Sequence, residues 1–292
     1  MRKTVLFLFG VCLFISTAIQ AAAQDQPPGP PKILSIFREE IKPAKGAAHE
    51  RAEVAYVKAF REAKWATPYL AMTSISGPNE AWFISGYPSF DAWEKDNAAV
   101  EKNTALKAAL DQADEQDSAL RTGQRAVIAR YREDLSYNAG INVGQMRYFQ
   151  IVTFRVRPGH AQGFEEARKI TKAAHEKANV NEHYAIYQVV SGMPGGTFLL
   201  FLPYKSLSEM DTDPHTKAYQ DALGDENRAK IARMTSDDVQ LTESTIFAFS
   251  PRMSYVTEEI ASVDPGFWKP KPIRPKTVAA KKAEGTPPPA KP

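Results

Sequence analysis

Cysteine is almost absent from this chain. The single cysteine, Cys12, lies in the apolar segment at the N-terminus. If that segment is removed during export, the mature chain has no thiol. Disulfides, thiolate metal sites and cysteine nucleophiles are then excluded, although an exported compartment would permit disulfides.

Common catalytic motifs are also missing. The sequence contains no GxSxG, no HExxH and no P-loop, so it shows none of the usual signatures of a serine hydrolase, a zinc peptidase or a nucleotide-binding loop. Neighbouring acidic residues such as Glu39-Glu40 and Glu165-Glu166 form no convincing acid–base dyad. We expect these four carboxylates to be solvated.

The chain has little net charge where a folded body is expected. The total of +3 divides into +2 from residues 1–23, +5 from residues 264–292 and −4 from the body between them. A mildly acidic body does not indicate a nucleic-acid surface. We therefore expect no nucleic-acid partner.

Residues 1–23 have the pattern of a secretory signal peptide. Arg2 and Lys3 precede an apolar run from Val5 to Ile19, and three alanines follow at 21–23. This order predicts cleavage before Gln24 and a periplasmic or secreted protein. An uncleaved membrane anchor is the alternative, but the apolar run is short for a span.

Two further segments have the composition of unstructured chain. Residues 24–32 are Pro-rich and are expected to form a linker. Residues 258–292 form a Pro/Lys-rich tail that we expect to be disordered. The tail is either a solvated spacer or a segment that makes weak contact with an anionic envelope surface.

The body contains an internal repeat. The stretch from Pro43 to Pro88 matches the stretch from Pro158 to Pro203 at an offset of 115 without a gap, and the hydrophobic pattern agrees better than the residue identities. Such self-similarity indicates duplication. We expect one unit at 33–137, a linker at 138–146 and a second unit at 147–257.

Each unit has the same predicted order of elements: strand, helix, strand, strand, helix, strand. In the first unit the strands are expected at 33–41, 69–76, 81–86 and 126–131, and the helices at 46–64, 89–93 and 98–120. In the second unit the strands are expected at 147–156, 184–190, 197–202 and 242–250, and the helices at 161–178 and 206–234. This order is that of a ferredoxin-like βαββαβ unit.

The strands are apolar on both faces, as in the segment FQIVTFRV at 149–156. One ferredoxin-like sheet has helices on one face only, so its other face needs a cover. Two units packed sheet to sheet would meet this need. In the first helix, alanines at three- and four-residue steps from Ala48 to Ala63 predict the face that lies on the sheet.

The opening of each unit, above all VTFRVRPGHAQGFEEARK at 152–169, resembles that of the dimeric α/β barrel superfamily, in particular its antibiotic-biosynthesis monooxygenase-like and NIPSNAP-like domains. The resemblance implies an α+β fold of two fused ferredoxin-like units. The superfamily includes cofactor-independent monooxygenases, haem enzymes, isomerases and proteins without known activity. It also implies a ligand cleft between the sheet and the helices of one unit.

His49 and Tyr56 are the candidate catalytic residues. The repeat places His49 opposite Phe164, at a position expected to face the sheet, and Tyr56 lies seven residues later on the same helical face. Such a pair could orient a substrate or exchange a proton. The alternative is a histidine that turns to solvent. The candidate ligand-binding residues are Phe60, Trp82, His183 and Tyr187.

The remaining histidines do not predict a metal or haem site. His160, His175, His183 and His215 all lie in the second unit, and no two have the i, i+4 spacing of a helical metal site. The GxxDG motif of the dye-decolorising peroxidases, which duplicate the same fold, is absent. We therefore predict no metal and no cofactor.

Three functions remain open. The first is an exported protein that binds a small apolar or aromatic molecule in an α/β cleft. The second is a cofactor-independent monooxygenase-like enzyme. The third is an envelope-associated structural protein that acts through its basic tail. The fused pair is expected to be a monomer or a homodimer.

Overall fold

The computed structural model describes residues 29–270. The predicted signal peptide at 1–23, and the part of the predicted tail from 271 onward, lie outside the described residues. Within residues 29–270, no helix combines the length and the apolar composition that a membrane span requires.

The first half of the described chain contains four strands and three α-helices. They follow in the order β1 (Ile33–Ile41), α1 (Gly46–Glu62), β2 (Leu70–Ser74), β3 (Glu80–Tyr87), α2 (Phe90–Lys102), α3 (Thr104–Ser118) and β4 (Arg121–Tyr131). Ser89 caps α2, because its hydroxyl accepts from the Ala92 amide at 3.1 Å. The strand β4 begins at Arg121, five residues before its predicted start at 126.

The second half follows a similar order. It contains β5 (Tyr148–Val156), α4 (Ala161–Ala178), β6 (Ala185–Ser191), β7 (Thr197–Tyr204), α5 (Lys217–Leu223), α6 (Asp225–Asp238) and β8 (Val239–Phe249). The helical region predicted at 206–234 is interrupted: a 3-10 turn at Leu207–Asp211 precedes α5, and Gly224 separates α5 from α6. The positive φ of Gly224, 74°, is a conformation that glycine adopts without strain.

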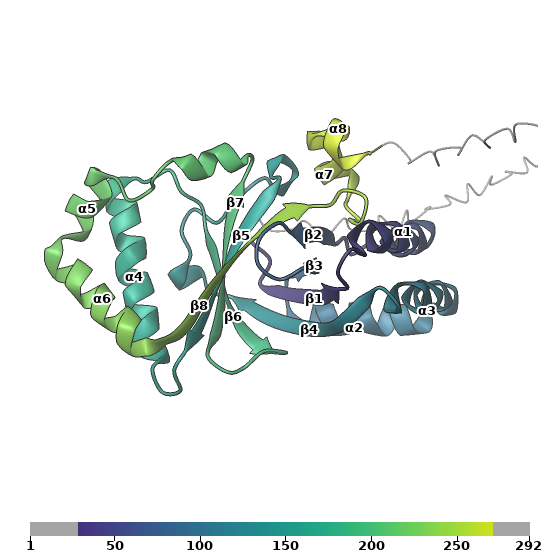
Figure 1. The fold of residues 1–292 in the computed structure, drawn as a ribbon, viewed down its shortest axis with the longest axis horizontal. Helices are drawn as coiled ribbons and strands as arrows, with labels where there is room; N and C mark the ends of the chain where they lie inside the picture. Colours follow the sequence, from purple (N-terminus) through teal and green to yellow (C-terminus); the bar gives the residue numbers. More distant parts are fainter. Residues whose placement is uncertain (1–28, 271–292) are drawn as a thin grey trace, which may run out of the picture.

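The eight strands form a closed barrel in the order β1-β3-β2-β8-β5-β7-β6-β4, and every neighbouring pair is antiparallel. Two seams join the halves: β2 pairs with β8, and β4 pairs with β6. Figure 1 shows α1, α2 and α3 outside one side of the barrel and α4, α5 and α6 outside the other. The strands of the two halves are therefore joined edge to edge in one closed sheet, and none of the eight strands within residues 29–270 has an unpaired edge.

The barrel interior is one hydrophobic core with residues from all eight strands. Its buried members on the strands are Leu34, Ile36, Met72, Trp82, Ile84, Val127, Ala129, Phe149, Ile151, Tyr187, Leu199, Phe201, Phe247 and Phe249. Alternate residues of the same strands face the helices instead. Separate clusters around Val57 and Phe164 fill the space between the wall and the helices.

The prediction of a disordered tail from residue 258 is wrong for residues 258–270. Two short helices occur there, α7 (Glu258–Val263) and α8 (Pro265–Trp268). Trp268 is buried, and its indole Nε1 donates to the Gly144 carbonyl at 2.8 Å. The aromatic pair Phe267-Trp268 supplies apolar surface that the Pro/Lys-rich composition of the whole tail concealed.

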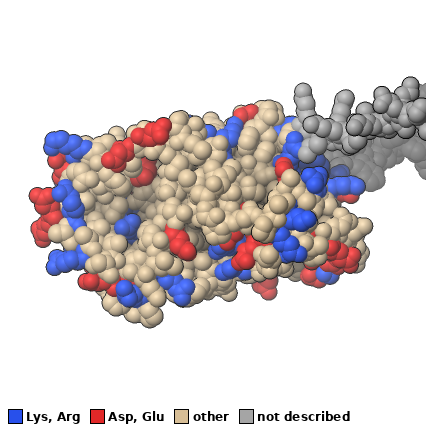
Figure 2. All heavy atoms as spheres, in the orientation of Figure 1, with Lys and Arg blue, Asp and Glu red and all other residues tan. Residues whose placement is uncertain are grey.

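Charged side chains of both signs are interspersed over the face of the molecule shown in Figure 2. The middle of that face, over the strands of the barrel, is mostly uncharged. This face therefore has no large patch of side chains that all carry the same charge.

Candidate functional site

Polar residues gather on both sides of the barrel wall where β1 ends. Arg38 points into the barrel with the alternating set of Leu34 and Ile36, whereas Glu39 points to the helices. The inner residue lies at the mouth of the barrel. The outer residue lies in a buried cluster of ionisable side chains.

A hollow of about 300 Å³ occupies this mouth; we call it the barrel-mouth pocket. Four strands line it, because the carboxyl ends of β1 and β5 lie beside the amino ends of β3 and β8. The lining residues are Arg38, Gly77, Pro78, Glu80, Trp82, Ile151, Thr153, Met193, Glu243, Ser244, Thr245 and Phe247.

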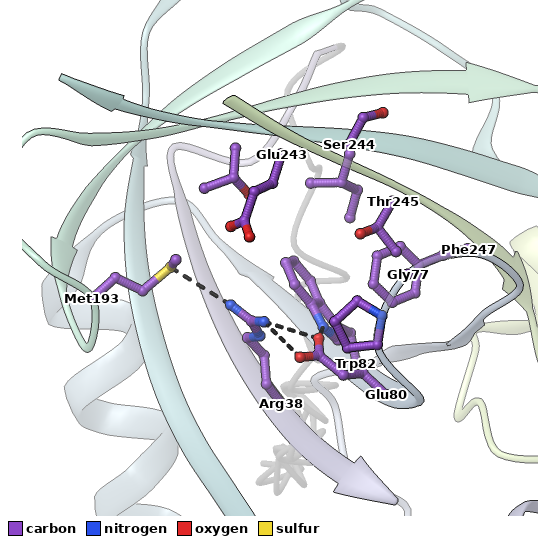
Figure 3. A pocket seen from close by; sticks show the side chains of 12 residues that line it. Arg38, Gly77, Glu80, Trp82, Met193, Glu243, Ser244, Thr245 and Phe247 are labelled. Atoms are coloured by element: carbon purple, nitrogen blue, oxygen red, sulfur yellow. Dashed lines mark hydrogen bonds and ion pairs between the residues drawn. The ribbon is translucent and has the colours of Figure 1, made fainter. Parts of the chain in front are cut away.

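Arg38, Glu80 and Trp82 form one fixed unit in the pocket (Figure 3). Arg38 Nη2 donates to both carboxylate oxygens of Glu80 at 2.9 Å, and the Trp82 indole Nε1 donates to Glu80 Oε2 at 2.6 Å. The Arg38 guanidinium carbon lies 4.4 Å from the centre of the Trp82 ring, within the range of a cation–π contact. The guanidinium is therefore held in one orientation.

This unit leaves hydrogen-bonding capacity unused. Arg38 Nε is buried and has no hydrogen-bond partner among the described residues, and Nη1 contacts only the Met193 sulfur, at 3.8 Å. Glu243 lies on the opposite wall of the hollow, and within residues 29–270 it makes no ion pair. The pocket therefore offers a hydrogen-bond donor on one wall and an acceptor on the other.

On the helix side of the wall, five ionisable residues form what we call the buried cluster. Glu39 comes from β1, His49 and Glu53 from α1, Asp117 from α3 and Arg121 from the first position of β4. The side chains of His49 and Asp117 are 1% and 0% exposed. Charged groups buried to this degree are stable only with well-placed partners.

The carboxylates converge on one nitrogen atom. His49 Nε2 lies 2.6 Å from Glu39 Oε2, 3.7 Å from Glu53 Oε1 and 3.7 Å from Asp117 Oδ1. Arg121 binds the other oxygens of two of them, with Nη1 at 2.6 Å from Glu39 Oε1 and Nε at 3.0 Å from Asp117 Oδ2. Arg121 thus orients both carboxylates toward the histidine.

The protonation of the cluster follows from its burial. Burial raises the pKa of Glu53 to about 9, and the charges of Glu39 and Asp117 add to the shift. The Glu53 carboxyl is therefore protonated at neutral pH. Burial also raises the pKa of Asp117, and neither of its oxygens has a hydrogen-bond partner among the described residues.

Two expectations about this region were wrong. Glu39 was expected to be solvated, but it is 2% exposed, because His49 and Arg121 supply its partners. The alanines of α1 were expected to form the face on the sheet, but of these only Ala59 is among the buried residues of α1, which are His49, Glu53, Val57 and Ala59. The i, i+4, i+8 spacing of the first three was the signal that could have identified this face.

The structure brings the two catalytic candidates near the same cluster without bringing them into contact with each other. His49 faces the sheet, as the repeat predicted. Tyr56 lies at the outer edge, where its hydroxyl donates to Asp114 at 3.3 Å, and Asp114 is bound in turn by Arg121. Neither His49 nor Tyr56 lines the barrel-mouth pocket.

The four ligand-binding candidates do not form one cleft. Trp82 lines the barrel-mouth pocket. Phe60 packs against Tyr69 and Tyr255 on the helix side. His183 Nδ1 is hydrogen-bonded to the Asn138 carbonyl at 2.7 Å. Tyr187 is buried in the barrel core, and its hydroxyl donates to the Pro31 carbonyl.

Sequence reasoning missed Arg38, Glu80 and Glu243 in the pocket, and Glu39, Glu53, Asp117 and Arg121 in the cluster. Isolated charged residues in a strand or a helix usually point to solvent. Two sequence signals were available: the alternation along β1, which places Glu39 on the outer face opposite Arg38, and the helical spacing of His49 and Glu53 along α1.

Comparison with known proteins identifies similar folds but no related sequence. No protein-family model matches the sequence, and no curated protein matches it. Among solved structures, the "Putative monooxygenase" from Fusobacterium nucleatum subsp. nucleatum is 15% identical, with 76% of this chain and 93% of that chain covered and a TM-score of 0.50. A monooxygenase of the same description from Lactobacillus acidophilus is 12% identical over 74% and 93%, with a TM-score of 0.48.

A chlorite dismutase mutant from Candidatus Nitrospira defluvii, solved with cyanide, is 11% identical over 80% of this chain and 95% of that chain, with a TM-score of 0.41. At such identities a likeness shows the fold alone, so the chemistry has to be argued from the residues. The chain has the fold of the dimeric α/β barrel proteins.

Proposed function

We propose that this protein binds a small aromatic or apolar molecule in the barrel-mouth pocket. The observation that carries the proposal is the Arg38–Glu80–Trp82 unit, which lines a hollow of about 300 Å³ with an indole ring and with a guanidinium held in one orientation. A concave site with an aromatic wall and a few converging polar groups is typical of small-molecule sites.

The charges of the pocket restrict the ligand. Arg38 is balanced by Glu80, and Glu243 adds one negative charge on the other wall. An anionic ligand would therefore be repelled, whereas a neutral molecule could accept from Arg38 and donate to Glu243. The expected ligand is a neutral or weakly cationic aromatic molecule with a carbonyl, hydroxyl or amine substituent.

The proposal differs in one respect from what the superfamily resemblance implied. The expected cleft lay between the sheet and the helices of one half. In this chain the corresponding space of the first half is occupied by the buried cluster. The binding function is therefore assigned to the inner face of the barrel wall.

A calorimetric binding screen tests the proposal. Neutral, cationic and anionic aromatic compounds are titrated into the full chain, and the heat of binding is measured. Binding is expected for neutral or cationic compounds, and Trp82→Phe should weaken it by at least about tenfold, because the ring and the Glu80 bond are altered. The matched control is Trp93→Phe, on α2 outside the pocket. Equal binding by both variants would contradict the assignment.

The second candidate function is monooxygenase-like catalysis in the same pocket. It is favoured by Glu243, a carboxylate without an ion-pair partner in the described chain, which could accept a proton from a bound phenol or enol. His49 is a poor base for this reaction because it is buried and its Nε2 contacts Glu39. Oxygen consumption with a bound compound, lost in Glu243→Gln while binding persists, would identify an enzyme.

We further infer that the two halves descend from one ferredoxin-like unit. Support comes from the gap-free offset of 115 and from the similar order of elements in both halves. Under this alignment Arg38 corresponds to Thr153 and Trp82 to Thr197, so the pocket is built by one half and completed by the other. Within residues 29–270, we therefore expect the second half to lack a pocket with this set of residues.

Export from the cytoplasm, and attachment through the basic tail, remain separate proposals that rest on the composition of residues 1–23 and 264–292. The mass of the mature protein from an exported fraction tests the first, since cleavage before Gln24 fixes that mass. The fraction bound to anionic vesicles, with and without residues 271–292, tests the second.

A further inference from the structure

The buried cluster contains the donor set of a metal site. One nitrogen of His49 and one oxygen each of Glu39, Glu53 and Asp117 all lie within 4.8 Å of one another. These four residues come from three separate elements, β1, α1 and α3. Their convergence is therefore a product of the tertiary fold rather than of one acidic stretch.

Asp117 provides a second, independent observation. Its side chain is 0% exposed, and neither oxygen has a hydrogen-bond partner among the described residues. Oδ2 is ion-paired with Arg121 at 3.0 Å, but Oδ1 is directed toward His49 Nε2 at 3.7 Å. A fully buried carboxylate oxygen without a donor is costly unless a cation or another ligand satisfies it.

The composition of the cluster leads to the same conclusion. Three buried carboxyl groups and one imidazole face the single guanidinium of Arg121. Buried acidic groups are stable only with well-placed positive partners or ligands. A divalent cation among the four donor atoms would supply that partner.

We propose that the buried cluster binds one divalent transition-metal ion, with His49 Nε2, Glu39, Glu53 and Asp117 as its ligands. One imidazole with three carboxylates, without a thiolate, suits Zn²⁺ or a neighbouring first-row ion better than Mg²⁺ or Ca²⁺. The ion would take the place of the proton between His49 Nε2 and Glu39 Oε2.

The distances need little adjustment. A tetrahedral ion with bonds of about 2.0–2.2 Å holds its ligand atoms roughly 3.3–3.5 Å apart. Two of the three separations from His49 Nε2 are 3.7 Å, the 2.6 Å contact to Glu39 has to open, and the carboxylate oxygens, which lie within 4.8 Å of one another, have to move closer together. Arg121 holds the non-ligating oxygens of Glu39 and Asp117, which is the role of an outer-shell partner.

The second half of the chain provides a natural comparison. At the offset of 115, Glu39, His49 and Glu53 correspond to Phe154, Phe164 and Arg168. The Arg168 guanidinium lies 5.5 Å and 5.7 Å from the centres of those two phenylalanine rings. The same place in the fold thus has an aromatic pair and one arginine, so the proposed site belongs to the first half alone.

Metal binding by the full chain tests the proposal. Protein stripped with EDTA is titrated with Zn²⁺, and metal content is measured after dialysis. We expect one Zn²⁺ per chain and a higher thermal midpoint, with no such response to Mg²⁺ at the same concentration. The Co²⁺-loaded protein should show the absorption bands of a four-coordinate ion. A wild-type chain that retains no Zn²⁺ would overturn the proposal without reference to any variant.

Variants then locate the site. His49→Phe, which introduces the residue of the second half, and Asp117→Asn should each lower Zn²⁺ affinity by more than the roughly 10–100-fold typical of outer-shell changes. The matched control is Asp114→Asn: Asp114 also binds Arg121 but is half exposed and is not one of the four ligands. If both ligand variants bound Zn²⁺ as the control does, the site would lie elsewhere and the assignment would be refuted. Barrel-mouth binding should survive in all three variants, so the two proposals fail separately.

Discussion

Arg38 and Glu39 are adjacent in β1 and serve opposite sides of the barrel wall. Arg38 is bound to Glu80 in the barrel mouth, and Glu39 is bound to His49 and Arg121 beneath the helices. The alternation of a β-strand places the two charges on opposite faces without any irregularity in the backbone. One strand end therefore supports both candidate sites.

Arg121→Met is expected to destabilise the metal-free protein strongly. The substitution leaves Glu39 and Asp117 buried without their guanidinium partner, and removal of one partner of a buried ion pair costs about 3–5 kcal/mol. Arg125→Met is the control, because Arg125 lies on the same strand and makes only an exposed pair with Glu40, for which about 0–1 kcal/mol is expected. Urea unfolding at pH 7 measures both. Similar losses in the two variants would mean that the cluster is not a buried ion network.

Gly192→Ala is expected to weaken the seam between β4 and β6. Gly192 has a φ of 87°, and a Cβ there would lie 1.9 Å from the Ala126 carbonyl oxygen. Strain of this kind costs on the order of 1–3 kcal/mol for the dihedral alone, and the clash adds to it. Gly195→Ala, in the same loop, meets no atom within 4 Å and should change stability by less than about 1 kcal/mol. Thermal unfolding of both variants decides whether the seam contributes to stability.

Arg132→Met is expected to reduce the dependence of stability on acid pH. Hydrogen bonds from Arg132 lower the pKa of Asp134 and of Glu165 below their usual 3.8 and 4.5. A lowered pKa in the folded state means that stability is present above the unfolded values and is lost as the pH falls through the lowered ones.

The free energy of unfolding of wild type and Arg132→Met should therefore differ most at pH 7 and converge near pH 3. The difference at pH 7 is expected to be about 1–2 kcal/mol, because the pairs are partly exposed. A difference as large at pH 3 as at pH 7 would assign the effect to packing rather than to charge.

Trp268→Ala is expected to destabilise the barrel although residue 268 lies beyond the last strand. The ring is buried, contacts Phe249 at a centroid distance of 5.9 Å and bonds the Gly144 carbonyl. Truncation of a buried tryptophan costs about 3–5 kcal/mol. The neighbouring Lys269 is exposed at its side chain, so Lys269→Ala should have almost no effect. Equal midpoints for the two variants in urea would show that α8 is not part of the folded unit.

The sequence by itself indicated the order of the eight strands and the main helices, and it offered the sheet-facing position as one of two for His49. The apolar strands and the helical spacing of small residues are local signals, and each depends on residues close together in the chain. The repeat indicated a sheet-facing position for His49, opposite Phe164, but the sequence left a solvent-facing histidine open as the alternative. These features need no knowledge of distant contacts.

Only the tertiary structure decided which charges are buried and where the chain can hold a ligand. Glu39, Asp117 and Arg121 are far apart in sequence, and each alone has the character of a solvated side chain. Their burial is stable because closure of the barrel and packing of α1 and α3 bring opposite charges within 2.6–3.0 Å. The barrel-mouth pocket likewise exists only because Glu243, from the second half, closes against Arg38 and Trp82, from the first. Long-range pairing of this kind leaves no local pattern, which is why sequence reasoning could not find it.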